Sequence, residues 1–103
     1  MLVAFSVAPS GADESGSVHK AVAEAVRIVR ESGLPNHTDS MFTTIEGEWT
    51  EVFDVIRRAT EAVGRYGSRV SLVLKADIRP GYSGQLTAKV ERVEKALAED
   101  IGN

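Results

Sequence analysis

The chain has 103 residues, enough for one domain and too few for two, so we expect a single domain over residues 1–103. Its formal net charge of −3 argues against a surface that binds nucleic acid. It contains no cysteine, which excludes disulfides and thiolate chemistry. No stretch approaches the roughly 20 apolar residues of a membrane span, and the apolar start lacks the basic leader of a secretory signal. We therefore expect a cytoplasmic protein with no membrane partner.

The first third of the chain predicts a strand, a loop and a helix. Residues 2–8 are apolar on both faces, which is typical of a central strand, and Pro9 is expected to end it. Residues 10–16 have the composition of a loop, and their two glycines lack the lysine that a phosphate-binding loop needs. A helix over 18–32 follows, with Ser17 as its N-cap and Gly33 as a left-handed C-terminal cap.

The rest of the chain alternates between strand and helix patterns. A polar edge strand and a second strand form a hairpin, and a helix with an apolar seam begins at Trp49. The predicted elements are strands 36–41 and 43–48, helix 49–65, strand 69–77, loop 78–85 and helix 86–99.

This order predicts an α+β fold, the ferredoxin-like βαββαβ sandwich with an extra C-terminal helix. The sheet is expected to be four-stranded and antiparallel, in the order 4-1-3-2, with two helices on one face. The other face would expose Leu2, Ala4 and Val73. An apolar surface of this kind on a small protein predicts self-association with a second copy.

Several motifs resemble a family of small bacterial and archaeal thiamine-binding proteins. They are Phe5-Ser-Val-x-Pro9-x-Gly11, Met41-x-Thr43-x-Ile45-Glu-Gly47-x-Trp49 and Leu74-Lys75-x-Asp77-x-Arg79. The resemblance implies a ferredoxin-like fold, dimers that assemble into tetramers, and binding of thiamine or its hydroxymethylpyrimidine part without catalysis. In one departure, Phe42 stands where the family usually has glycine. Either the turn differs here or Phe42 adds an aromatic wall to the site.

Glu46 is the leading candidate for a ligand contact. Its carboxylate would accept a hydrogen bond from the aminopyrimidine and offset the cationic thiazolium. The alternative is a structural ion pair with Lys75, itself a further candidate. Three hydroxyls and one amide have the chemistry to bind the pyrimidine, although each also fits backbone or turn hydrogen bonding. The full set of candidates is Ser6, Asn36, Thr43, Thr44, Glu46 and Lys75.

Two other classes of function remain open. A small ferredoxin-like enzyme, of the isomerase or oxygenase type, would use His37 and Asp39 as its acid and base. These two side chains are too few for a metal site, and we assign neither a catalytic residue nor a cofactor. A purely structural or regulatory oligomer is the third interpretation, since the fold alone does not choose among the three. Trp49 and Phe53 are expected in the core.

Overall fold

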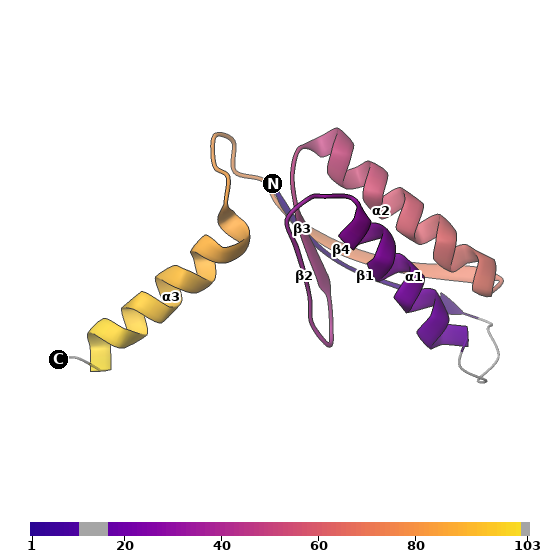
Figure 1. The fold of residues 1–103 in the computed structure, drawn as a ribbon, viewed down its shortest axis with the longest axis horizontal. Coiled ribbons are helices and arrows are strands. Elements are labelled where there is room, and N and C mark those ends of the chain that lie inside the picture. The colour runs from indigo at the N-terminus through magenta and orange to yellow at the C-terminus, as the bar shows by residue number, and fades with distance from the viewer. Residues whose placement is uncertain (11–16, 102–103) are drawn as a thin grey trace.

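The structure is a computed structural model that describes residues 1–10 and 17–101 (Figure 1). The predicted loop lies outside the described residues except for Ser10, and so does the side-chain cap predicted for Ser17. The observed elements are β1 (Leu2–Ser10), α1 (Ser17–Glu31), β2 (Asn36–Thr38), β3 (Thr43–Glu46), α2 (Trp49–Val63), the 3-10 turn η1 (Gly64–Tyr66), β4 (Arg69–Asp77) and α3 (Gln85–Ile101).

The four strands form one antiparallel sheet in the order β2-β3-β1-β4, so the predicted order is confirmed. β1 is longer than predicted because Pro9 pairs with Val70 and Ser10 with Arg69. Met1 and Gly47 exchange two hydrogen bonds. The N–H and C=O groups of the odd-numbered residues of β1 therefore point toward β3. Pro9 has no N–H group, and its main chain faces the side of β3. Because β3 pairs with β1 only as far as Phe5, the sheet loses no hydrogen bond at Pro9.

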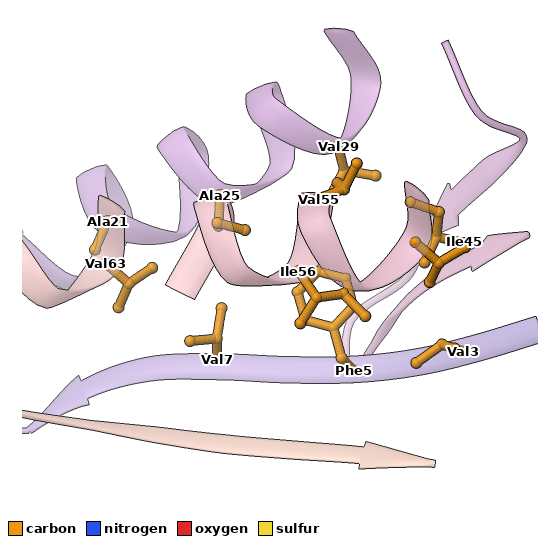
Figure 2. Close-up of a cluster of buried hydrophobic side chains, with 12 residues drawn as sticks. Val3, Phe5, Val7, Ala21, Ala25, Val29, Ile45, Val55, Ile56 and Val63 are labelled. Carbon is orange, nitrogen blue, oxygen red and sulfur yellow. The ribbon is translucent and has the colours of Figure 1, made fainter. Parts of the chain in front are cut away.

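α1 and α2 cover one face of the sheet and enclose the core (Figure 2). The side chains of β1 alternate strictly, and those that point toward the helices are buried. α1 contributes small residues four positions apart, which lets it lie close to α2. The buried cluster consists of Val3, Phe5, Val7, Ala21, Ala25, Val29, Ile45, Val52, Val55, Ile56, Ala59 and Val63.

The apolar seam predicted for α2 is confirmed from Val52 onward, but Trp49 does not belong to it. The Trp49 side chain is 56% exposed and stacks on Phe53, with the ring centroids 5.2 Å apart. Trp49 is the first residue of the helix, one turn before the first buried position, and the loop after β4 lies beside it. Phe53 is only partly buried and packs against the core from its side.

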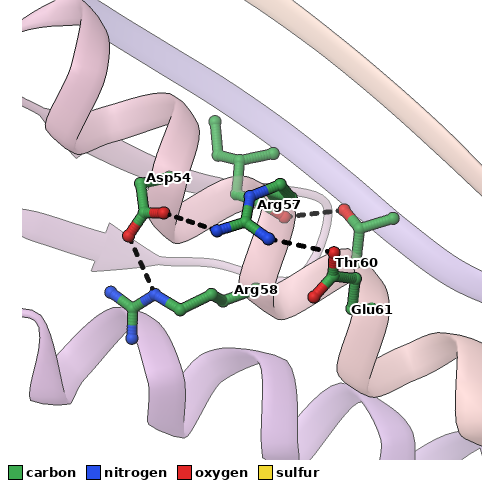
Figure 3. Close-up of polar contacts among 6 residues, drawn as sticks. Asp54, Arg57, Arg58, Thr60 and Glu61 are labelled. Atoms are coloured by element: carbon green, nitrogen blue, oxygen red, sulfur yellow. Dashed lines mark hydrogen bonds and ion pairs between the residues drawn. The ribbon is translucent and has the colours of Figure 1, made fainter.

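The outward face of α2 is a row of ion pairs (Figure 3). Asp54 accepts hydrogen bonds from Arg57 at 2.8 Å and from Arg58 at 3.1 Å, and Arg57 also reaches Glu61 at 3.1 Å. The hydrogen bond from Arg57 lowers the pKa of Asp54 below its ordinary value. These side chains are exposed, so the pairs contribute little to stability and mark the surface that faces water.

α1 ends at Glu31, and Gly33 beyond it has the predicted left-handed conformation, with a φ of +79°. The main chain then turns, and Glu46 N–H donates to the carbonyl of Pro35 at 2.9 Å, which fixes the start of β2 beside β3. β2 is shorter than predicted because Asp39 already belongs to the turn of the hairpin.

Candidate ligand-binding site

Asp39 organises the turn between β2 and β3. Its Oδ1 accepts hydrogen bonds from the N–H groups of Met41 at 2.8 Å and Phe42 at 2.9 Å, and its own N–H donates to the carbonyl of Phe42. The bonds from Phe42 and Met41 lower the pKa of Asp39 below its ordinary value of 3.8. Because all residues with positive φ in the described chain are glycines, Phe42 fits this turn without strain.

A cavity of about 200 Å³ lies between this hairpin, β1 and α1. It exists because β3 pairs with β1 only as far as Phe5, while β1 continues for five further residues. By the alternation of the strand, the N–H and C=O of Val7 point into the gap, where no strand of the described chain pairs with them. The cavity is lined by residues 5–8 of β1, residues 38–43 of the hairpin, and Val22, Ala25 and Val26 of α1.

The polar groups of the cavity suit a flat heteroaromatic ring. The hydroxyl oxygens of Thr38 and Thr43 are 3.2 Å apart at one wall, and Phe42 belongs to the residues that line the cavity. The main chain of Val7 offers one donor and one acceptor, the pattern that an aminopyrimidine edge matches. Asp39 lies at the exposed rim and carries a negative charge at neutral pH. Apolar walls with a few directed polar groups are typical of small-molecule sites.

The structure divides the six predicted site residues among four places. Thr43 lines the cavity, and Ser6 belongs to its lining too, although Ser6 pairs with Val73 and its side chain therefore points to the open face of the sheet. Asn36 and Thr44 line a wider groove of about 680 Å³ between the hairpin and α3. Lys75 pairs with Ala4 on the open face of the sheet, opposite to the helices. The Asn36 side chain donates to the carbonyl of Leu34 at 2.8 Å, which matches the alternative interpretation of that residue as part of a turn.

Glu46 is only 7% exposed, and both of its carboxylate oxygens are engaged by α3. The N–H of Gln85 donates to Oε2 at 2.9 Å and that of Leu86 to Oε1 at 3.2 Å. Within the single chain, no ion pair between Glu46 and Lys75 occurs among the described residues. The role of Glu46 as a ligand contact stays a prediction, and its carboxylate now has a second function as the cap of a helix.

Two features of this site escaped the sequence reasoning. Asp39 was considered only as an acid or base with His37, whereas its carboxylate builds the turn and sits at the rim of the cavity. An aspartate at the first position of a tight turn is a recognised signal for this arrangement. The main chain of Val7, with which no described strand pairs, had no signal in the sequence, because its exposure depends on how far β3 extends along β1.

The described residues contain no group of three or more His, Asp or Glu side chains placed to hold a metal ion. Within the same part of the chain, no helix is long and apolar enough to cross a membrane.

The sheet order, the two helices on one face and the pocket beside the first helix define a class of small ferredoxin-like α+β proteins with room for a ligand at the hairpin. Within this class, residues 3–94 match the model of the thiamine-binding protein family, and the chain belongs to that family. The resemblance read from the motifs is thereby confirmed.

Relatives and solved structures agree with this assignment. A UPF0045 protein of Mycobacterium bovis is 54% identical over 98 residues, which cover 94% of each chain. A solved structure of a hypothetical protein from Methanocaldococcus jannascii is similar with a TM-score of 0.79 at 26% identity, over 90% of this chain and 94% of that one. A domain of unknown function from Bacillus cereus gives a TM-score of 0.75 at 31% identity, over 86% and 85% of the two chains.

Proposed function

We propose that the protein binds thiamine, or its hydroxymethylpyrimidine part, in the cavity between the hairpin and α1, without catalysing a reaction. The observation that carries this proposal is the position of Thr43. It belongs to a motif that resembles the family, and it lines the cavity together with Ser6 and the main chain of Val7, with which no described strand pairs.

The size of the cavity supports binding of one ring inside it. Sites for drug-sized ligands enclose roughly 300–1,000 Å³. At about 200 Å³ the cavity suits the single pyrimidine ring, and the second ring of thiamine would lie at the mouth. The exposed Met41 and the carboxylate of Asp39 border that mouth, where a negative charge offsets the cationic thiazolium.

The proposal includes self-association in the cytoplasm, to a dimer or tetramer. Val73 is 57% exposed on the sheet face opposite to the helices, and it pairs with Ser6 of β1, on the same face as Ala4 and Leu2 further along that strand. This apolar surface supports contact with a second copy. The enzyme alternative has less support, because the Asp39 carboxylate is held by two main-chain N–H groups in the turn.

Titration of the full chain with thiamine and with hydroxymethylpyrimidine tests the proposal, and two neighbouring threonines provide a matched pair. Thr43→Val removes a hydroxyl from the cavity, and Thr44→Val removes one from the opposite face of the sheet. We expect Thr43→Val to weaken binding by up to about tenfold, the value of one neutral hydrogen bond, while Thr44→Val leaves it unchanged. Absence of binding to the unmodified chain would overturn the function, and equal effects of both changes would overturn the site.

A further inference from the structure

The cavity beside the hairpin continues onto the outer surface of α1. A shallow hollow of about 550 Å³ lies on that surface, and Val22 and Val26 line both the hollow and the cavity. Val22 is 40% exposed, so the two spaces meet over an apolar side chain at the surface. A ligand that fills the cavity can therefore extend across these two valines into the hollow.

The hollow beyond the two valines is mainly basic. The rest of its lining consists of His19, Ala23, Arg27, Arg30 and Glu31. It thus contains two guanidinium groups and one carboxylate, in a chain whose formal net charge is −3. Arg27 forms an ion pair with Glu24 at 3.5 Å, whereas Arg30 forms none with a described residue.

The geometry of α1 places the two arginines beside each other. Residues three positions apart are neighbours on the surface of a helix, as Arg27 and Arg30 are. Helical side chains lean toward the N-terminus and cover the preceding turn, which directs Arg30 toward Val26 and Arg27 toward Ala23. Neighbouring guanidinium groups, each with a planar set of N–H donors, are suited to binding a phosphate group.

We propose that this hollow binds the phosphate group of a phosphorylated thiamine, whose pyrimidine ring occupies the cavity. The inference rests on the proposed function and names the class of ligand that the same site prefers, a phosphate ester of thiamine. In such an ester the phosphate is carried by the hydroxyethyl chain of the thiazolium ring, at the end of the molecule opposite to the pyrimidine.

The charges of the protein follow the order of the charges in the ester. Asp39 at the rim of the cavity offsets the thiazolium, and Arg27 and Arg30 lie beyond Val22 and Val26, where the phosphate extends. A phosphate monoester carries a charge of roughly −1.5 to −2 at neutral pH. Free thiamine has no group for the basic hollow, and free phosphate has no ring for the cavity.

The hollow stays accessible when the protein self-associates through its open sheet face. α1 covers the face of the sheet opposite to the exposed Val73 (Figure 1). The hollow and the surface proposed for self-association therefore lie on opposite sides of the sheet.

Calorimetric titration of the full chain with thiamine, thiamine monophosphate and inorganic phosphate tests the inference. At low ionic strength we expect the monophosphate to bind about two- to twentyfold more tightly than thiamine, the range for one or two exposed ion pairs. This preference should decrease as the ionic strength rises, because salt screens exposed charges. Inorganic phosphate alone is expected to bind at least about tenfold more weakly than the monophosphate.

Arg30→Glu and Lys20→Glu form a matched pair of variants. Both make the same change of charge at an exposed position of α1, but Lys20 does not line the hollow. The measured quantity is the ratio of the affinity for the monophosphate to the affinity for thiamine. We expect this ratio to fall to about one or below in Arg30→Glu and to stay within about twofold of the native value in Lys20→Glu.

The outcomes separate this inference from the proposed function. Equal affinity of the native chain for thiamine and its monophosphate at low ionic strength would overturn the inference and leave thiamine binding standing. Equal effects of Arg30→Glu and Lys20→Glu would overturn it too, because the net charge would then cause the preference. So would inorganic phosphate that binds as tightly as the monophosphate. Absence of binding for all three thiamine compounds, hydroxymethylpyrimidine included, would overturn the proposed function and this inference with it.

Discussion

Glu46 and Gln85 are 39 positions apart in the chain, and the N–H of Gln85 donates to Oε2 of Glu46 at 2.9 Å. Together with the bond from Leu86, this contact joins the end of β3 to the first turn of α3. A carboxylate at the N-terminus of a helix satisfies N–H groups that have no partner within the helix, and its charge interacts favourably with the helix dipole. The position of α3 therefore depends on this buried side chain, together with the ion pair between Lys89 and Asp77.

Replacing Glu46 by glutamine tests this role. Glu46→Gln keeps the shape of the side chain but removes the charge and one of the two acceptors. We expect the attachment of α3 to weaken by about 1.5–3 kcal/mol, the value of hydrogen bonds to a charged group. Faster hydrogen exchange at the amides of Gln85 and Leu86, with unchanged protection in β1, would report it. If thiamine affinity fell and the exchange of these amides stayed the same, Glu46 would instead contact the ligand.

The core of α2 provides a prediction about stability. Ile56 is 2% exposed, so Ile56→Ala should reduce the free energy of unfolding by roughly 2–5 kcal/mol. Trp49→Ala is the comparison, since that larger side chain is 56% exposed and should cost less in spite of its size. Urea denaturation of both variants measures the difference. A larger loss for Trp49 would contradict its position at the surface.

Phe42 offers a test of the aromatic wall. Phe42→Gly should weaken binding of the pyrimidine ring, because it removes the ring that lines the cavity and leaves the turn hydrogen bonds of Asp39 in place. Phe42→Leu should lose less, since it keeps an apolar wall. Calorimetric titration of both variants with hydroxymethylpyrimidine measures the effect. Equal affinity in Phe42→Gly and the native chain would place the ligand elsewhere.

The sequence was sufficient for the fold because its signals are local and repeat along each element. The expected open face of β1, with Leu2 and Ala4, leaves Val3, Phe5 and Val7 for the core, and these three are buried. The periodicity of a helix predicts the direction of a side chain, but it does not predict whether another element packs against that side chain. Trp49 continues the seam of α2 but begins the helix, beyond the first buried turn.

The site was predicted only in part, since its residues depend on contacts between distant segments. Thr43 and Thr44 are neighbours on a strand, so they point to opposite faces and line different hollows. Glu46 was identified as a buried carboxylate in need of a partner. Its partner is the main chain of α3, and a main-chain N–H leaves no mark in a sequence pattern.

The last prediction concerns Asp39 and distinguishes the binding of the thiazolium ring of thiamine from the binding of its pyrimidine ring. Its pKa is lowered below 3.8 by the N–H groups of Phe42 and Met41, so the carboxylate is charged throughout the neutral range. Asp39→Asn retains an oxygen that accepts the same two bonds, and the turn should survive. We expect thiamine affinity to fall roughly two- to fivefold, the value of one exposed charge pair, while affinity for hydroxymethylpyrimidine, which lacks the thiazolium, stays constant.

The pH dependence of thiamine binding tests independently whether the Asp39 carboxylate contacts the thiazolium ring. A pKa that is lower in the folded state than in the unfolded state stabilises the turn above pH 3.8, and this contribution is lost as the pH falls through the lower, folded value. Thiamine binding through Asp39 should weaken over that acidic range in the native chain and show no such step in Asp39→Asn. NMR titration of the Met41 and Phe42 amides follows the turn itself. An equal loss of affinity for both ligands in Asp39→Asn would mean that the turn had collapsed, and the thiazolium would not lie beside this carboxylate.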